Sequence, residues 1–234
     1  MLELKNVTYK IIQNGQEKTI LDNVSCVIKK GDFVAITGHN GSGKSTLTKA
    51  IMGMVNINSG TILFNGKDIS NLPIHKRAKL GLNYAFQQPV LFSGITIKDL
   101  IDMATGKENS VIKACEYLSK VGLCAKEYIN REFDKSLSGG EQKRVELALA
   151  LAKKGECLIF DEPEAGIDLF SFEKLGAIFE KDATFIVVSH QEKLLKQADK
   201  IIVMENGKIK DFGKSKDVLK RLNPRACQRI TGGK

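Results

Sequence analysis

The chain has 234 residues, of which 42% are hydrophobic and 27% charged, with 21 glycines and 4 prolines. This composition excludes collagen-like and intrinsically disordered proteins, and it predicts a globular protein with a full hydrophobic core. The 36 Lys and Arg residues outnumber the 27 Asp and Glu residues, which gives a formal net charge of +9. Such a balance favours an anionic partner: a nucleotide, a nucleic acid, a lipid headgroup or an acidic protein surface.

The five cysteines are odd in number and share no C-x-x-C spacing, which argues against a disulfide framework or a zinc site. A reducing, cytoplasmic location is expected, because the first residues also lack a basic segment followed by an apolar one. The most apolar helical stretch, Val145 to Ala152, is far shorter than the ~20 residues that cross a bilayer. Any membrane role is therefore expected to come through a partner.

The N-terminal part of the chain is predicted to be rich in β-structure. Apolar patches on either side of a polar turn at 14–16 predict antiparallel strands. The apolar run 33–37 predicts a buried strand, which leads through a glycine-rich loop to a helix over 44–52. Further strands are predicted at 61–64 and 82–86.

The middle of the chain predicts helices, because apolar residues recur at helical spacing between 95 and 121. The rest of the chain predicts a helix at 139–153, a strand at 157–160, a helix at 171–179 and a strand at 184–188. A hairpin turn is predicted at 205–207 and an irregular tail at 223–234. A basic helix precedes the tail. Because strands alternate with helices, we expect an α/β fold with a mainly parallel sheet, an N-terminal antiparallel β-subdomain and an inserted helical subdomain.

The segment from Gly38 to Ser45 matches G-x-x-x-x-G-K-[ST], the pattern of a phosphate-binding loop. Glycines let successive backbone N–H groups and the start of the next helix face the phosphates. Lys44 is expected to reach the β- and γ-phosphates and the Ser45 hydroxyl to bind Mg²⁺. The predicted nucleotide-binding residues are Gly38, His39, Asn40, Gly41, Ser42, Gly43, Lys44, Ser45 and Thr46.

Two acidic residues, Asp161 and Glu162, follow the apolar run 157–160 at the carboxyl end of a predicted strand, where open parallel sheets present ligands. Asp161 is expected to bind Mg²⁺ through water, and Glu162 is the candidate general base that polarises the attacking water.

His190 also follows a predicted strand and is a candidate contact for the γ-phosphate, although a lone histidine is more often structural or exposed. Gln87 follows the strand at 82–86. Its amide suits a metal or water ligand, but a polar loop residue is the plain alternative.

When Leu137-Ser138-Gly139-Gly140-Glu141 is added to these elements, nearly the whole chain resembles an ABC-type ATPase. The resemblance identifies Gly38 to Ser45 as the Walker A loop, Gln87 as the Q-loop glutamine and Leu137 to Glu141 as the signature. It identifies the strand that ends at Asp161 as Walker B and Glu162 as the catalytic glutamate. It also implies a D-loop at Ala165 to Asp168 and a switch histidine at His190. Lys44 would assist catalysis, and Ser45, Gln87 and Asp161 would hold Mg²⁺.

The resemblance also implies an organisation and a dimer. It predicts one ABC ATPase domain with a P-loop NTPase core over approximately 1–86 and 155–222, a helical subdomain over 87–154 and a tail over 223–234. Two copies would pair head to tail on ATP, with Ser138, Gly139 and Gly140 of one chain against the nucleotide of the other.

Two kinds of partner follow from the resemblance. The segments 77–89, 93–96 and 162–168 are similar to those of SufC, the ATPase of Suf iron–sulfur cluster assembly, which serves a SufB/SufD-type scaffold. We therefore expect a SufC-like role, with the ATPase subunit of a membrane transporter and its transmembrane permease as the alternative. The absence of the asparagine common after the SufC signature is a departure. DNA-repair and translation members of the family differ in architecture, so no direct nucleic-acid partner is expected.

Three further features are left open by the residues. Val90, Leu91, Phe92, Ile95 and Ile97 are suited either to receiving a partner helix or to packing inside the helical subdomain. The position of the family's adenine-stacking aromatic falls on Ile11 in this sequence. Tyr9 is an alternative stacking residue, although packing is its more expected role. Cys227 lies in the basic tail and is more readily an ordinary surface thiol than one near cluster chemistry.

Overall fold

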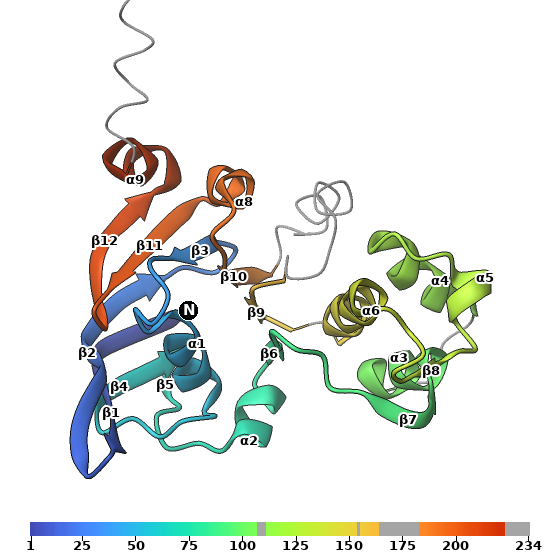
Figure 1. The fold of residues 1–234 in the computed structure, drawn as a ribbon, viewed down its shortest axis with the longest axis horizontal. Helices are drawn as coiled ribbons and strands as arrows, with labels where there is room; N and C mark the ends of the chain where they lie inside the picture. Colours follow the sequence, from blue (N-terminus) through green and yellow to red (C-terminus); the bar gives the residue numbers. More distant parts are fainter. Residues whose placement is uncertain (107–110, 154, 164–182, 223–234) are drawn as a thin grey trace, which may run out of the picture.

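The computed structural model describes residues 1–106, 111–153, 155–163 and 183–222. The predicted helix over 171–179, the D-loop Ala165 to Asp168, Cys227 and the tail lie outside the described residues. Within them, two β-sheets and their helices form one lobe, and a group of helices forms a second lobe beside it (Figure 1).

The first sheet is antiparallel and contains the N-terminal strands in the order β2-β1-β4-β5. The strands are β1 (Leu2–Gln13), β2 (Gln16–Ile28), β4 (Ser59–Phe64) and β5 (Lys67–Asp68). β1 pairs with β2 across the turn at Asn14 and with β4 on its other edge. This confirms the antiparallel opening predicted from the polar turn.

The second sheet has six strands in the order β12-β11-β3-β10-β9-β6, and all of its pairs except β11–β12 are parallel. The strands are β3 (Phe33–Thr37), β6 (Leu82–Ala85), β9 (Cys157–Asp161), β10 (Thr184–Val188), β11 (Lys200–Glu205) and β12 (Lys208–Lys214). Every residue of β3, β9 and β10 is buried. Burial on both faces explains why these strands read as continuous apolar runs.

Helices α1 (Lys44–Met52), α2 (Ile74–Lys79), α8 (Glu192–Gln197) and α9 (Ser215–Leu222) belong to the lobe that contains the two large sheets. The second lobe contains α3 (Ile97–Thr105), α4 (Val111–Lys120), α5 (Ala125–Tyr128) and α6 (Gly139–Ala152), with the short strands β7 (Phe92–Thr96) and β8 (Glu132–Phe133). Two crossings join the lobes, one after β6 and one before β9 (Figure 1). The short elements α2, α5, α8, β5, β7 and β8 were not among the elements predicted from the sequence.

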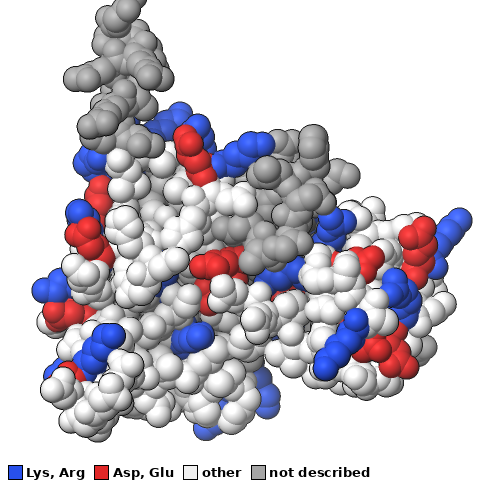
Figure 2. All heavy atoms as spheres, in the orientation of Figure 1, with Lys and Arg blue, Asp and Glu red and all other residues white. Residues whose placement is uncertain are grey.

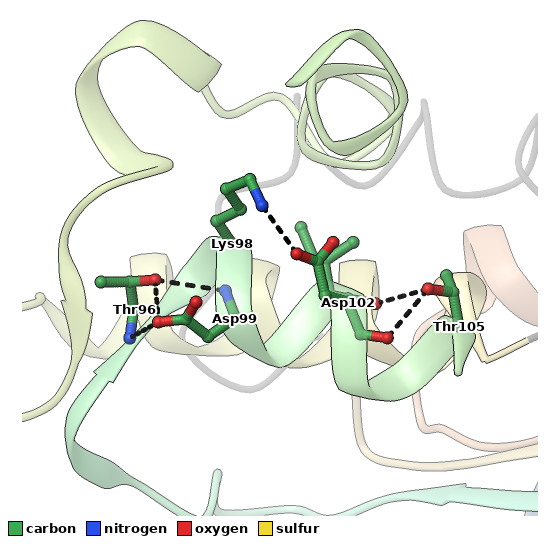
Figure 3. A network of polar contacts seen from close by, with 6 residues as sticks. Thr96, Lys98, Asp99, Asp102 and Thr105 are labelled. Carbon is green, nitrogen blue, oxygen red and sulfur yellow. Dashed lines mark hydrogen bonds and ion pairs between the residues drawn. The ribbon is translucent and has the colours of Figure 1, made fainter. Parts of the chain in front are cut away.

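One helix of the second lobe, α3, is held by a network of polar contacts at both ends (Figure 3). Thr96 and Asp99 form a capping box: the Thr96 Oγ1 accepts the Asp99 N–H at 3.2 Å, and the Asp99 carboxylate accepts the Thr96 N–H at 3.2 Å. Lys98 forms an ion pair of 2.7 Å with Asp102, one turn on. Thr105 closes the last turn by donating to the Asp102 carbonyl at 3.0 Å. The capping box and the Thr105 hydroxyl satisfy free backbone groups at the two helix ends, whereas the ion pair joins side chains only.

Charge is dispersed over the face shown in Figure 2, where Lys and Arg side chains are scattered over both lobes and interspersed with acidic side chains. The net charge of +9 is therefore not gathered into one basic surface on that face. Among the described residues, none of the helices combines the length and the apolar character needed to cross a bilayer.

The guanidinium of Arg77, 2% exposed, ties α2 to the end of α1. Its nitrogens donate to four backbone carbonyls, those of Leu72, Ser70, Ala50 and Ile51, each at 2.8 Å. The last two belong to the final turn of α1, whose carbonyls have no partner inside the helix. Arg77 therefore fixes the helix that starts at the phosphate loop.

We expect Arg77→Met to lower the free energy of unfolding by about 3 kcal/mol, because it leaves several buried carbonyls without a donor. Denaturant unfolding checks this. The control is Lys76→Met, which removes an exposed charge from the same helix and should change stability by less than about 0.5 kcal/mol. Equal, small effects of the two substitutions would show that Arg77 does not hold α1.

Candidate nucleotide-binding and catalytic site

The predicted phosphate loop joins β3 to α1, and its glycines are required by the backbone. Gly38 has φ 140°, and a Cβ there would lie 2.1 Å from the Met204 carbonyl oxygen. Gly43 caps α1 with φ 100°, and no acidic residue lies in the first turn of that helix. The N–H groups at the start of α1 therefore form a site that favours an anion.

Lys44 and Ser42 lie within this loop. The Lys44 ammonium is buried and donates to the carbonyls of Gly38 at 2.8 Å and His39 at 3.0 Å. Burial lowers the pKa of Lys44, and the nearby carboxylates of Glu162 and Asp161 partly oppose that effect. The Ser42 hydroxyl is buried and has no hydrogen-bond partner among the described residues. A buried unpaired hydroxyl beside a buried ammonium fits a loop built to hold phosphate oxygens.

A cavity of about 790 Å³ opens beside the loop. It is lined by residues from six separate parts of the chain: Lys18, Thr19, Ile20, Asn40, Gly41, Gly43, Lys44, Ser45, Thr46, Gln87, Glu162, His190, Asn206 and Gly207. The predicted residues Gly38 and His39 line a second cavity of about 460 Å³, with Asn40 and His190 common to both. The phosphate loop thus lies between the two cavities.

Asp161 ends β9 and is 3% exposed. Both of its carboxylate oxygens accept hydrogen bonds: Oδ1 from the Ser45 hydroxyl at 2.9 Å, and Oδ2 from the Tyr84 hydroxyl at 2.9 Å. Burial is the main cause that raises the pKa of Tyr84, so its phenol stays protonated and available as a donor. No motif in the sequence indicates a role for Tyr84.

Glu162 has an unusual backbone. Its φ is 48°, and the other non-glycine residues with positive φ in the described part of the chain are all asparagines. Asparagine tolerates this region readily, whereas glutamate in it indicates local strain of the kind that clusters at functional sites. The carboxylate accepts a hydrogen bond of 2.7 Å from the Gln87 amide, which brings these two predicted residues together.

His190 completes the group at the end of β10. Partial burial lowers its pKa, as does the positive charge of Lys44, while Glu162 acts in the opposite direction. The imidazole is therefore neutral at neutral pH and able both to donate and to accept.

Ser45, Asp161 and Gln87, the predicted magnesium ligands, present hydroxyl, carboxylate and amide groups on the same side of the sheet end. Hard oxygen donors of this kind fit Mg²⁺, which in such sites takes one or two protein ligands and completes its shell with phosphate and water. In the described ranges, no three His, Cys, Asp or Glu side chains gather at a metal-binding distance.

The signature residues lie apart from this cavity. Ser138 caps α6, the Glu141 N–H donates to its Oγ at 3.4 Å, and the Glu141 carboxylate accepts the Ser138 N–H at 2.7 Å. The Glu141 carboxylate also accepts the Tyr128 hydroxyl at 2.5 Å. None of the five signature residues, Leu137 to Glu141, lines the cavity that holds Lys44.

Several cavity residues were not predicted to belong to the site. Lys18, Thr19 and Ile20 come from the first part of β2, and Asn206-Gly207 is the turn between β11 and β12. The Gly207 N–H donates to the Ser42 carbonyl at 3.1 Å, and the Asp22 N–H donates to the Gly207 carbonyl at 2.9 Å. The Asn-Gly turn was predictable, but its contact with the phosphate loop depends on the order of strands in the sheet.

Tyr9 packs partly buried against the core, as expected, and Ile11 does not line the cavity.

A buried ion pair connects the signature helix to the start of the Q-loop. Lys143 and Glu146 on α6 form a bond of 2.8 Å, with side chains 1% and 12% exposed. Both side chains hydrogen-bond to the backbone of Phe86: the Phe86 N–H donates to Glu146 at 2.7 Å, and Lys143 donates to the Phe86 carbonyl. Burial raises the pKa of Glu146, and Lys143 opposes that rise. No pattern in the sequence predicts this contact between the lobes.

Together, the loop, the buried lysine and the acidic strand end define a P-loop nucleotide-binding site. A protein-family profile described as ABC transporter matches residues 21–165. Because that profile spans more than half of the chain, the chain belongs to the family of ABC transporter ATPases, whose ATPase domain binds and hydrolyses ATP.

Individual relatives carry transporter names. An uncharacterized ABC transporter ATP-binding protein of Methanocaldococcus jannaschii is 35% identical, with 86% of this chain and 85% of that protein covered. An energy-coupling factor transporter ATP-binding protein, EcfA1, of Mycoplasmopsis synoviae is 36% identical, with 94% and 85% covered. A spermidine/putrescine import ATP-binding protein, PotA, of Bacteroides thetaiotaomicron is 37% identical; the match covers 86% of this chain and 45% of PotA.

A solved structure with the same fold is a dimeric ATP-binding cassette in a post-hydrolysis state, bound to ADP and phosphate. Its TM-score to this chain is 0.83 at 27% identity, with 92% of this chain and 99% of that chain covered. The match confirms the predicted fold class.

We expect Glu162→Gln to keep ATP binding while lowering the hydrolysis rate by about 10²- to 10⁴-fold, because the amide cannot take up a proton from water. Phosphate release and equilibrium binding of a fluorescent ATP analogue measure the two effects separately. The control is Glu192→Gln on the surface of α8, which should leave both unchanged. Wild-type hydrolysis by the Glu162 variant would remove Glu162 as the candidate base.

We expect Lys143→Met to lower the free energy of unfolding by about 3–5 kcal/mol, because it leaves the buried Glu146 carboxylate without its counter-charge. The double variant Lys143→Met/Glu146→Leu should recover most of that loss, since it removes both charges. Urea unfolding of the three proteins provides the measurement. A double variant as unstable as the single one would contradict this account.

Proposed function

We propose that this chain is the ATP-binding and ATP-hydrolysing subunit of an ABC transporter and that it works with a separate membrane-spanning permease subunit. The observation that carries the proposal is the convergence of Lys44, Glu162 and His190 on one cavity, at the carboxyl ends of β3, β9 and β10. The transporter names of the relatives add support and favour this alternative over a Suf-type role.

Each residue has a task that its position suits. The backbone N–H groups between Gly38 and Ser45 would bind the phosphates, with Lys44 supplying a positive charge. Glu162 would orient and polarise the attacking water. His190, neutral for the reasons above, would hydrogen-bond to the γ-phosphate or to that water.

Ser45, Asp161 and Gln87 would hold Mg²⁺ with the nucleotide. When bound, the ion neutralises charge on the phosphate oxygens. The protein's own part is to fix the ligands: Ser45 and Asp161 are already joined at 2.9 Å, and Gln87 is held by Glu162 at 2.7 Å.

We also propose an ATP-dependent homodimer in which each signature meets the other chain's nucleotide. Two observations support it. The signature opens α6, a 14-residue helix whose first N–H groups suit an anion, and it does not line its own chain's cavity. The related cassette of known structure is described as dimeric.

A groove between α3, α6 and the end of β6 is the surface proposed for the permease. This docking groove has a volume of about 450 Å³ and is lined by Asn83, Tyr84, Phe86, Val90, Phe92, Leu100, Met103, Ala104, Phe133, Glu146, Leu149, Ala150 and Lys153. Val90 is 51%, Phe92 42% and Met103 69% exposed, an apolar surface that a partner helix would cover. Ile97 is fully buried, and Leu91 and Ile95 pack against the helical core, so these three belong to the core.

A Suf-type scaffold partner is the second candidate, favoured by the segments 77–89 and 93–96. Two residues of the segment 77–89 have structural roles that explain their presence. Arg77 caps α1, and Gly81, at φ 99°, lies against the Glu156 backbone. Both are requirements of this fold and do not identify a partner. Most of the third segment, from Glu164 onward, lies outside the described residues.

In-cell crosslinking, followed by purification from detergent-solubilised membranes and in parallel from an anaerobic soluble extract, identifies the partner. We expect a chain with several apolar segments of ~20 residues. A span-free partner that carries iron or sulfide would replace the transporter proposal with the Suf-type one.

We expect Met103→Arg to reduce partner capture by about 10- to 100-fold, because it places a charge in the apolar docking groove, and to leave ATP binding intact. Ile12→Arg is the matched control: Ile12 is 81% exposed on β1, outside the groove. If both variants capture the partner as well as wild type, the groove is not the docking surface.

A further inference from the structure

One side chain, Tyr84, touches both the docking groove and the metal-binding end of the site. Tyr84 lines the groove, and its ring meets the Phe86 ring edge-on, with centroids 5.1 Å apart and planes at 63°. Its hydroxyl lies on the other side, where it donates to Asp161 at 2.9 Å. Few side chains span the distance between a surface groove and a buried carboxylate, and a tyrosine does so because one end is apolar and the other polar.

The strand register explains this placement. Tyr84 on β6 is paired with Ile159 on the parallel strand β9. Side chains of paired residues lie on the same face of a sheet, and a residue two positions further on lies there again. Asp161 is two residues beyond Ile159, so the Tyr84 and Asp161 side chains lie on one face of the sheet near its carboxyl end. Phe86 directly follows the last residue of β6, Ala85.

The hydrogen bonds around the Tyr84 hydroxyl also have a definite order. The Tyr84 oxygen lies 3.2 Å from the Thr48 hydroxyl, which donates to the Ser45 carbonyl at 3.0 Å. The two hydroxyls have one proton each, and the shorter bond to an ionised acceptor takes the Tyr84 proton. The Asp161 carboxylate is thus oriented by Ser45 on one oxygen and by Tyr84 on the other.

We propose that Tyr84 is a positioning residue that holds Asp161 for the metal and transmits the state of the docking groove to it. The proposal rests on the proposed function, since it takes Asp161 as a magnesium ligand and the groove as the partner's site. A partner that moves Phe86 changes the packing of the Tyr84 ring. The hydroxyl at the other end of that rigid ring then shifts relative to the carboxylate.

The substitution Tyr84→Phe isolates the effect of the hydroxyl, because it removes that group and keeps the ring and its edge-on contact with Phe86. Outer-shell hydrogen bonds of this kind support metal affinity by about 10- to 100-fold. We expect Mn²⁺, which takes the same oxygen ligands and gives an EPR signal, to bind the nucleotide complex about tenfold more weakly. ATP binding in EDTA should stay unchanged. The matched control is Tyr117→Phe, a partly buried tyrosine on α4 outside the groove, which should not alter either value.

Transmission from the groove is tested by a double-mutant cycle with Phe86→Leu. This change removes the ring that contacts Tyr84 and retains the Tyr84 hydroxyl group. We expect it to weaken Mn²⁺ binding about threefold in the wild-type background and not at all in the Tyr84→Phe background.

The outcomes separate the proposals. Wild-type Mn²⁺ affinity in Tyr84→Phe, with normal ATP binding, would overturn the positioning role. Additive effects of Tyr84→Phe and Phe86→Leu would overturn the transmission from the groove. A wild-type protein that binds no ATP would instead overturn the proposed function itself.

Discussion

The site depends on the parallel register of three buried strands. Val188 at the end of β10 is paired with Asp161 on one side and with Ile36 on the other, so β3, β9 and β10 reach the same level. In a parallel sheet the carboxyl ends all face one edge, and the loops that leave them meet there. The phosphate loop, the acidic pair and His190 are far apart in the chain, and this register alone brings them to one cavity. A slip of one residue would turn the Asp161 side chain to the other face.

The segment 84–87, next to that edge of the sheet, connects the catalytic residues to the helical lobe. Tyr84 reaches Asp161, Gln87 reaches Glu162, and the Phe86 backbone is bracketed by Lys143 and Glu146 from the signature helix. The same segment forms part of the docking groove. A buried ion pair costs desolvation and is weak support for stability on its own. Its position between the lobes is consistent with a role in fixing α6 relative to the nucleotide site.

Much of this site was predictable because local rules act on neighbouring residues. The pattern from Gly38 to Ser45 specifies a loop that only glycine backbones can form, and Gly38 does approach the Met204 carbonyl too closely for any side chain. An apolar run followed by two acids predicts a strand end, and β9 ends at Asp161 as expected. The short helices α2, α5 and α8 were missed, because four to six residues carry too little periodicity to predict a helix.

The sequence by itself determined the chemical groups of the site and the order of its elements, since each motif acts through residues adjacent in the chain. Only the tertiary structure decided which distant residues join them. The Asn206-Gly207 turn meets the phosphate loop because β11 lies beside β3. Tyr84 contacts Asp161 because β6 lies beside β9. Lys143 donates to the Phe86 carbonyl because α6 packs beside the end of β6. Local patterns do not contain the strand order, because it results from burying the whole sheet at once.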